Sequence, residues 1–355
     1  MSIYFIFFFI FYLLSIIKKF EINRSNFYNK KKIIFLTFLF LFIFIGLRDG
    51  VGGDDVRYQE YYEAVKSGIE TSASNESKEK PFFYLINKFA SLFDFGYILS
   101  VSFFSFIFSI SLILFCIYSG NLFFGLMLAM PILIIVMSMG YVTQSVALAF
   151  LMLAYVQFIK ERVLFFIIFI LIGAMFHPSI IVFLGMILLS FLNPKKLTIS
   201  ILAGILVIIF IFNVIFESYL IEQFDNYVGD KLESGGFVFR SVFNLISIFI
   251  FFIFINKKEL EKIYKILFYF FSISSSLLFL LYLASIPSTA IDRMALYLIP
   301  IQILIINKFL NDYYSANSRK IVSFIFFIIY FIYMLIWFNF SNFSSYWVPY
   351  KNILF

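Results

Sequence analysis

Long uncharged apolar runs, separated by short polar segments, dominate the pattern of this sequence. A transmembrane α-helix needs about 20 predominantly apolar residues, whereas the strands of a membrane β-barrel are about 10 residues long and alternate strictly. The runs are longer than such strands and apolar on all faces, so we expect an all-α polytopic membrane protein. About 12 transmembrane helices are predicted, at Met1–Ile17, Ile33–Leu47, Phe95–Tyr118, Leu122–Met139, Tyr141–Ile159, Val163–Phe176, Pro178–Leu192, Leu197–Phe216, Ser241–Ile255, Ile263–Ile286, Met294–Asn307 and Ile321–Phe340.

The distribution of Lys and Arg predicts which side of the membrane each loop faces, because cytoplasmic loops carry an excess of these residues. Of the 27 basic residues, 17 fall in alternate loops that hold only 5 of the 20 acidic residues. If these loops are cytoplasmic and the N-terminus lies on the outer side, every loop falls on the side that its charge predicts. We therefore expect one transmembrane domain over residues 1–355 with two sizeable periplasmic loops. Residues 48–94 form the first loop and end in an interfacial helix at Pro81–Asp94, and residues 217–240 form the second.

The segment Val163–Leu192 is the least regular part of this topology. Basic loops flank both of its ends, so it must cross the membrane an even number of times. Each half is only about 14 residues, or roughly 21 Å of helix. We expect either a short hairpin or a re-entrant pair, joined at His177-Pro178.

Composition excludes several classes of protein. Hydrophobic residues make up 63% of the chain and charged residues 13%, whereas a soluble domain is nearer half apolar and a quarter charged. The single Cys116 excludes an internal disulfide or thiolate metal cluster, and the single His177 excludes a multi-histidine metal site. The sequence has no P-loop, dinucleotide-binding motif, zinc-protease motif or EF-hand. The net charge of +7 mostly reflects membrane orientation, so we expect no nucleic-acid partner.

The strongest candidate chemistry follows the second span, where Gly46–Tyr58 holds three acids, two arginines and four glycines. Glycines let the backbone approach a ligand closely. The forked guanidinium groups of Arg48 and Arg57 suit two-point contacts to phosphate oxygens. A solvated loop that contains an Arg–Asp pair explains the same composition.

Four further polar residues open or interrupt apolar runs. His177, before Pro178, is an ionisable group at a helix junction, and it either exchanges a proton or only bonds a free carbonyl group. Arg293 and Arg240 each open a late span, where they either hold a phosphate or extend to lipid headgroups. Gln144 lies between two spans, and it either contacts a sugar hydroxyl or belongs to a simple turn.

These residues occur in a recognisable order. The chain has an Arg-x2-Val-Gly-x-Asp-x3-Tyr pattern, a Glu-x-Pro-Phe-Phe element, a Gln that opens a helix, a His-Pro-Ser junction and a late Arg, namely Arg48 to Tyr58, Glu79 to Phe83, Gln144, His177 to Ser179 and Arg293. In this respect it resembles the EpsG-like, Wzy-type polysaccharide polymerases over most of its length. The family commonly has Arg just before the Gln, where this chain has Thr143. Arg240 or Arg57 must compensate, or the site differs.

The resemblance implies a chemistry and a location. Wzy-type enzymes transfer a nascent glycan from undecaprenyl diphosphate to the non-reducing end of another lipid-linked repeat unit, on the periplasmic face of the bacterial inner membrane. The donor is already activated, so the resemblance implies no cofactor and no metal. It assigns the diphosphate to cations such as Arg48 and Arg293, and the base to Asp54 or His177. Membrane lipid is an implied partner, and a polysaccharide chain-length regulator is one that the resemblance allows.

Two other functions fit an apolar chain of this kind. A flippase or other transporter of lipid-linked oligosaccharides usually places its charges near the bilayer midplane, whereas the notable charges here lie at predicted outer helix ends. A ligase-like, lipid-dependent transferase usually has its large outer loop late in the chain, whereas the longest outer loop here follows the second span. The sequence leaves open the sugars, the linkage and the kind of surface polysaccharide.

Overall fold

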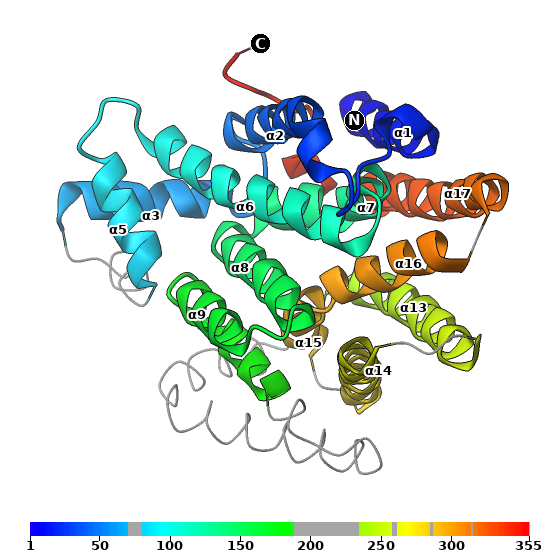
Figure 1. The fold of residues 1–355 in the computed structure, drawn as a ribbon. Coiled ribbons are helices and arrows are strands. Elements are labelled where there is room, and N and C mark those ends of the chain that lie inside the picture. Colours follow the sequence, from blue (N-terminus) through cyan, green and yellow to red (C-terminus); the bar gives the residue numbers. More distant parts are fainter. Residues whose placement is uncertain (70–79, 188–233, 258–260, 285–286, 314, 355) are drawn as a thin grey trace. The chain divides into compact units, whose positions relative to one another are not determined.

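The computed structural model describes residues 1–69, 80–187, 234–257, 261–284, 287–313 and 315–354. Over these residues the regular secondary structure is helical, apart from one isolated bridge between Arg48 and Asn352. The helices, drawn in Figure 1, form two compact units. Unit 1 contains Met1–Leu153, Leu171–Pro178 and Leu310–Phe355, and unit 2 contains Ala154–Ile170 and Ser179–Phe309. The expectation of one transmembrane domain stays a prediction.

Unit 1 contains most of the helices that the N-terminal apolar runs predict. Its elements are α1 (Ser2–Ile16), α2 (Lys31–Gly46), α3 (Asp55–Ser67), α5 (Pro81–Ala90), α6 (Tyr97–Ser119), α7 (Leu122–Ala129), the π-helix η3 (Met130–Ser138), the first part of α8 (Val142–Ile159) and α17 (Ala316–Phe340), with short 3-10 turns η1 (Lys18–Phe20), η2 (Phe27–Lys30) and η7 (Ser344–Tyr346). The change from α7 to the π-helix coincides with Pro131, which has no N–H to continue the α-helical hydrogen bonds. A helix does follow Lys80, with Pro81 in its first turn, but α5 ends at Ala90 rather than at the predicted Asp94. Its position at the membrane interface stays a prediction.

Unit 2 combines long apolar helices with shorter or bent ones. Its elements are the second part of α8, most of α9 (Val163–Ala174), the 3-10 helix η4 (Pro178–Gly185), α13 (Phe237–Lys257), α14 (Lys262–Leu283), α15 (Ser288–Leu296) and α16 (Ile299–Tyr313). The predicted run Met294–Asn307 is divided between α15 and α16, which meet at 47°. Pro300 lies in the first turn of α16, where its missing N–H removes no helical hydrogen bond. The same residue would interrupt α15 if that helix continued through it.

Four described helices are long and apolar enough to cross a membrane, namely α6, α8, α14 and α17, and α15 with α16 makes a fifth if the bent pair is one span. Shorter apolar helices lie at Ser2–Ile16, Leu122–Ser138, Val163–Ala174 and Phe237–Ile253. The chain is therefore a multi-pass membrane protein. Twelve spans are not confirmed, and the run Leu197–Phe216 and most of the second predicted outer loop lie outside the described residues.

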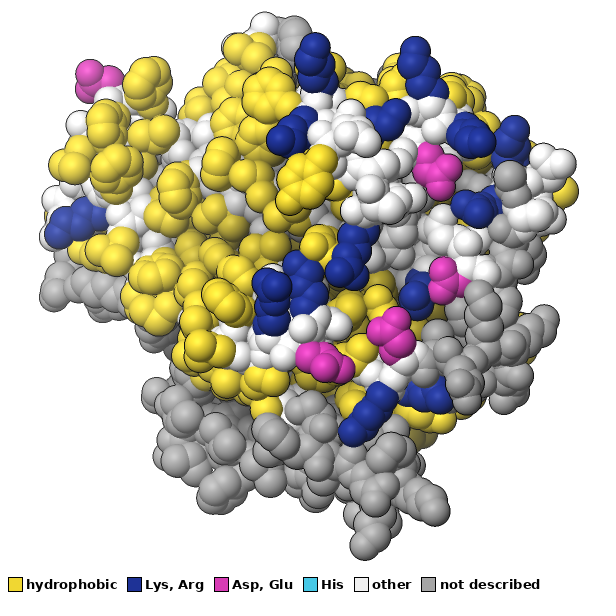
Figure 2. Space-filling model, in the orientation of Figure 1, with side chains coloured by type: hydrophobic (Ala, Val, Ile, Leu, Met, Phe, Trp, Pro, Cys, Tyr) yellow, Lys and Arg dark blue, Asp and Glu magenta, His cyan; other side chains and the backbone are white. Residues whose placement is uncertain are grey.

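The surface of the described residues also fits an apolar solvent. Figure 2 shows broad hydrophobic areas on one face, and Lys and Arg side chains that gather with a few acidic ones. Large apolar side chains are exposed on helices predicted to span the membrane, for example Phe35 on α2, Leu164 on α9 and Phe249 on α13. Water would not favour this exposure, whereas lipid does.

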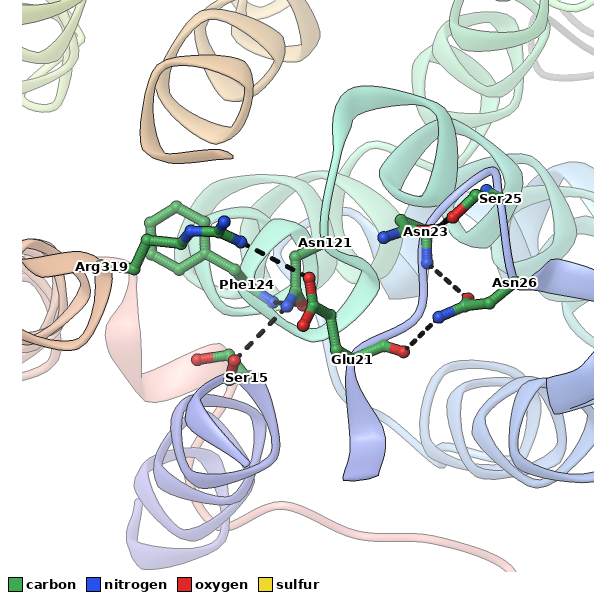
Figure 3. Close-up of polar contacts among 8 residues, drawn as sticks. All are labelled: Ser15, Glu21, Asn23, Ser25, Asn26, Asn121, Phe124 and Arg319. Atoms are coloured by element: carbon green, nitrogen blue, oxygen red, sulfur yellow. Dashed lines mark hydrogen bonds and ion pairs between the residues drawn. The ribbon is translucent and has the colours of Figure 1, made fainter. Parts of the chain in front are cut away.

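The loops and helix termini of unit 1 gather at two opposite ends of its helices. At one of these ends, polar contacts join the loops. Asn121, in the turn between α6 and α7, donates to the Ser15 carbonyl group near the end of α1 (3.4 Å) and accepts from the Phe124 N–H (3.1 Å) (Figure 3). The carboxylate of Glu21 lies 3.5 Å from the guanidinium group of Arg319, in the first turn of α17. We call this the Asn121 end.

The opposite end of unit 1 gathers the segment after α2, the turn before α8 and the C-terminal tail after α17. Near the start of α1, the Tyr4 hydroxyl donates to the Trp347 carbonyl group of this tail at 2.8 Å. The Tyr4 ring also stacks on Phe338, near the end of α17. We call this the Trp347 end, and it contains the candidate site.

Candidate functional site

The central residue of the Trp347 end is Arg48, which lies two residues after α2 and is only 3% exposed. Its Nε donates to the Val51 carbonyl group (2.9 Å), its Nη1 to Ile45 (2.6 Å) and its Nη2 to Met139 (3.1 Å). No carboxylate in the described part of the chain pairs with it. Arg48 therefore fixes the glycine-rich loop to the end of η3 while it remains a buried positive charge.

Gly52 shows why this loop needs glycine. Its φ is +127°, which side-chain-bearing residues rarely adopt. A Cβ atom there would lie 1.9 Å from the Met139 carbonyl oxygen. The close approach of the two backbones thus depends on the missing side chain. The expected approach of these glycines to a ligand stays a prediction.

The C-terminal tail completes the end, and sequence reasoning missed it. Backbone hydrogen bonds tie the tail to the loop along its length, in the pairs Gly52 to Tyr346 (3.0 Å), Asp49 to Lys351 (3.2 Å) and Ile353 to Leu47 (2.9 Å). The Tyr350 hydroxyl donates to the Phe44 carbonyl group at 2.8 Å. Only the uncommon pair Trp337 and Trp347 in a Phe-rich chain could have indicated a special role.

Trp347 is the anchor of the tail. It is 3% exposed, and its indole N–H donates to the Ile135 carbonyl group at 2.9 Å. A Cβ atom at Gly53 would lie 3.2 Å from its ring, and one at Gly140 would lie 2.9 Å from it. The indole therefore fills the space that these two glycines leave.

Helix α3 carries the acidic and aromatic candidates. Asp54 is its N-cap residue and is partly exposed, whereas Asp55 is 4% exposed. Burial raises the pKa of the Asp55 carboxyl group, while the positive charge of Arg48 and a hydrogen bond from Gln59 act in the opposite direction.

The buried Tyr58 connects α3 to the start of α8. Its hydroxyl lies 3.3 Å from the Thr143 hydroxyl, and the Thr143 N–H donates to it at 3.4 Å. Gln144 follows and is 1% exposed. Arg48, Tyr58 and Gln144 thus belong to one neighbourhood of unit 1.

Two cations lie beside the ring of Tyr61. The guanidinium carbon of Arg57 is 5.5 Å from the ring centroid, and the ammonium nitrogen of Lys80 is 5.7 Å from it. Arg57 is exposed, whereas Lys80 is buried at the start of α5. Lys80 was not among the predicted site residues, because a lysine in a charged loop has no distinguishing pattern.

His177 lies at the junction between α9 and η4, as expected, and is half-buried. Its backbone N–H donates to the Gly173 carbonyl group at 3.1 Å. The preceding segment docks on α5, because the Phe82 N–H donates to Met175 (3.1 Å) and the rings of Phe82 and Phe176 lie 5.6 Å apart. The junction therefore belongs to the same unit as Arg48.

The other two predicted arginines lie in unit 2. Arg240, on α13, is buried and forks onto both carboxylate oxygens of Asp292 on α15. Ser234 joins this pair, donating to Asp292 at 2.7 Å and accepting from Arg240 at 3.2 Å. Arg293, the next residue on α15, is partly exposed. The charge of Arg240 is thus neutralised within unit 2.

The comparison with protein families decides the identity. Residues 31–352 match the profile of the EpsG family, which is nearly the whole chain. The chain belongs to the EpsG family. This is a family of Wzy-like polymerases. Neither a curated protein nor a solved structure matches the chain.

EpsG membership confirms the resemblance that the ordered elements predicted. Of these elements, Glu79 lies outside the described residues, and the roles of the others stay predictions. At Thr143, where the resemblance led us to expect Arg, the side-chain hydroxyl lies 3.3 Å from that of Tyr58. Among the described residues, no three His, Cys, Asp or Glu side chains are grouped to hold a metal ion.

Proposed function

We propose that the chain polymerises undecaprenyl-diphosphate-linked repeat units of a surface polysaccharide, either O-antigen or capsule or exopolysaccharide. It transfers the nascent glycan to the non-reducing end of another lipid-linked unit. Membership of the EpsG family over residues 31–352 is the observation that carries this proposal. Apolar helices that can cross a membrane suit a substrate with a polyprenyl tail.

The reaction takes place at the Trp347 end, on the periplasmic face of a bacterial inner membrane. Contacts within unit 1 support this orientation. The predicted cytoplasmic segments that contain Glu21 and Arg319 meet at the Asn121 end, and the predicted outer segments around Gly52 and Trp347 meet at the opposite end. The full topology of about 12 spans is part of the proposal.

The chemistry requires a base and a cation. The acceptor hydroxyl attacks the anomeric carbon of the donor sugar and gives up its proton. The bond from that carbon to the diphosphate oxygen breaks, and the diphosphate leaves with the bonding electrons. His177 accepts the proton in our proposal, with Asp54 as the alternative, and both are accessible to solvent in part.

The arginines have two different roles in this proposal. Arg48 holds the loop through three carbonyl groups and supplies a buried positive charge. Arg57 contacts the diphosphate, because its side chain is exposed, whereas Arg240 is held by Asp292. The role of Arg293, which lies in unit 2, stays a prediction from the sequence. Tyr58, Gln144 and Glu79 bind substrate.

Deletion of the gene in its native strain tests the function. Electrophoresis of the surface polysaccharide should show a single repeat unit in the mutant and a ladder after complementation. Loss of every repeat unit would instead support a flippase or a ligase-like transferase. The base is tested by comparing His177→Gln with Asp54→Asn on lipid-linked units between about pH 5.5 and 8.5. A fully active His177→Gln protein would leave the histidine as a junction residue.

A further inference from the structure

The interior between α3, α5 and the first turns of α6 contains polar groups without partners. Asn87 on α5 is 0% exposed, and neither its amide nitrogen nor its oxygen has a hydrogen-bond partner in the described part of the chain. The hydroxyl groups of Ser100 on α6 and Tyr62 on α3 are likewise buried and unpaired. Such groups are rare in folded proteins, because a polar group that is buried without a partner loses the hydrogen bonds that it makes to water in the unfolded chain. Each one therefore needs an explanation.

Helical register places these three side chains in one layer. The rings of Phe83 on α5 and Phe104 on α6 stack at 5.5 Å. The two helices pack on each other. Asn87 follows Phe83 by one turn on α5, and Ser100 precedes Phe104 by one turn on α6, so we infer that Asn87 and Ser100 lie in the same layer. Figure 1 shows α3 and α5 beside the beginning of α6.

Aromatic contacts add α3 to this layer. The ring of Tyr62 lies 6.2 Å from that of Tyr97, which is one turn before Ser100 on the same face of α6. Each of the three helices therefore contributes an unpaired polar group to the layer.

A carboxylate borders the same layer. Asp55, also on α3, accepts from Gln59 Nε2 (3.0 Å) and from the Tyr97 hydroxyl (3.5 Å). Tyr97 thus links the Asp55 carboxylate to the ring of Tyr62. The assembled groups are a carboxylate, two amides and three hydroxyl groups, two of which are carried by aromatic rings.

This chemistry selects one class of ligand. The exposed Lys66 ammonium nitrogen lies 6.0 Å from the centroid of the Tyr62 ring, but none of the six side chains is itself cationic and one is a carboxylate, so the layer disfavours a phosphate. An amide both donates and accepts, and a carboxylate accepts from two donors, which matches adjacent hydroxyl groups on a sugar ring. Few polar groups among aromatic side chains are typical of small-molecule sites. We propose that this layer is a sugar-binding subsite that takes one ring of the repeat unit.

The proposal rests on the proposed function, because it assigns the layer to the glycan of the same lipid-linked substrate. Entry of a sugar requires α5 to part from α3 and α6. These outer helices are short, at 10 residues for α5 and 13 for α3. Local opening of such small elements is less costly than separation of the long spans.

The test uses Asn87→Leu, which keeps the volume and removes the polar atoms. Purified full-length protein in detergent is mixed with the free repeat-unit oligosaccharide, released from the surface polysaccharide of the native strain. The thermal midpoint and the oligosaccharide affinity are measured together. We expect an equal or higher midpoint, since an unpaired polar group is removed, and binding that is at least about tenfold weaker.

Ser109→Ala is the matched control. Ser109 is a second buried and unpaired hydroxyl group on α6, about two and a half turns deeper in the span than Ser100. Its loss should leave oligosaccharide binding unchanged. Ser100→Ala replaces Asn87→Leu if the leucine variant does not fold, and the same weakening is expected.

Unchanged binding by a folded Asn87→Leu or Ser100→Ala protein would overturn the subsite, since the layer would then hold only water. Wild-type protein that fails to bind the oligosaccharide would also overturn it. These readouts do not depend on polymerisation. Oligosaccharide binding without polymer formation would reject the polymerase alone, whereas polymer formation with unchanged binding in the variants would reject the subsite alone.

Discussion

Two buried arginines, one in each unit, are stabilised in opposite ways. Arg48 in unit 1 bonds to three backbone carbonyl groups, whereas Arg240 in unit 2 bonds to the carboxylate of Asp292. Carbonyl dipoles stabilise a guanidinium group without cancelling its charge, and a carboxylate cancels it. Arg48 therefore keeps a positive charge that no carboxylate of the described residues pairs with directly, whereas the charge of Arg240 is paired within unit 2. An anionic leaving group gains more from the first arrangement.

The largest effect is expected from Arg48→Ala. It leaves three buried carbonyl groups without a donor, at about 1–3 kcal/mol each, and removes the positive charge. We expect no polymer and a clearly lower thermal midpoint. Arg48→Lys should recover only part of both, since one ammonium group cannot span the three carbonyl groups. Arg319→Ala, which removes a partly exposed ion pair, is the control and should behave as wild type. Near-normal glycan length in Arg48→Ala would refute this role.

The ion pair of unit 2 should respond differently. Removing either Arg240 or Asp292 alone leaves a buried charge unpaired, and we expect a loss of about 3–5 kcal/mol. The double variant Arg240→Met with Asp292→Leu removes both charges and should return the thermal midpoint to near the wild-type value. Arg48 offers no such rescue, because its partners are backbone groups. A double variant as unstable as the single ones would contradict the comparison.

Two glycines of the loop form a matched pair. Gly52→Ala places a Cβ against the Met139 carbonyl oxygen at φ +127°, whereas the space around Gly50, at φ +61°, is open. We expect Gly52→Ala to cost at least about 3 kcal/mol and Gly50→Ala about 1 kcal/mol. Limited proteolysis of the loop should be faster in Gly52→Ala than in Gly50→Ala, and the glycan ladder should be shorter. Equal effects of the two substitutions would mean that the close approach to Met139 has no role.

The smallest effect concerns pH. The pKa of Asp55 is raised, so the folded protein holds this proton more tightly than the unfolded chain. Its contribution to stability is fully present below the unfolded pKa, near 3.8, and is lost as pH rises through the raised value. The thermal midpoint should fall over this range, and Asp55→Asn should flatten the fall. Asp49→Asn should reduce the fall only in part, because the negative charge of Asp49 adds to the raised pKa of Asp55 and burial is the larger cause. If the thermal midpoint of Asp55→Asn fell with pH as steeply as that of the wild type, another group would be the cause of the fall.

Much of the fold follows from the length of the apolar runs, because a membrane-spanning helix requires a long apolar segment. The runs Phe95–Tyr118 and Ile321–Phe340 appear as α6 and α17 within a few residues. The division of Met294–Asn307 was not predicted, since Pro300 and the polar start of α15 act through local backbone geometry rather than hydropathy.

The candidate site was predictable only in part. The glycine-rich loop was identified from its composition, but whether Arg48 faces a ligand or the backbone depends on Met139, which is 91 positions away in the sequence. The tail was missed because Trp347 acts through the absent side chains of Gly53 and Gly140, and no sequence pattern joins these distant positions. The partner of Arg240 was missed for the same reason, since Asp292 is 52 positions away.

A reconstituted reaction tests the central claim, that Arg48 at the Trp347 end of unit 1 supports polymerisation. Purified protein in lipid nanodiscs is incubated with lipid-linked repeat units and no nucleotide, and the products are separated by electrophoresis. We expect a ladder from wild-type protein and from the Arg240→Met, Asp292→Leu double variant, and only single units from Arg48→Ala. Unpolymerised units with wild-type protein, or a ladder from Arg48→Ala but none from the double variant, would contradict the account.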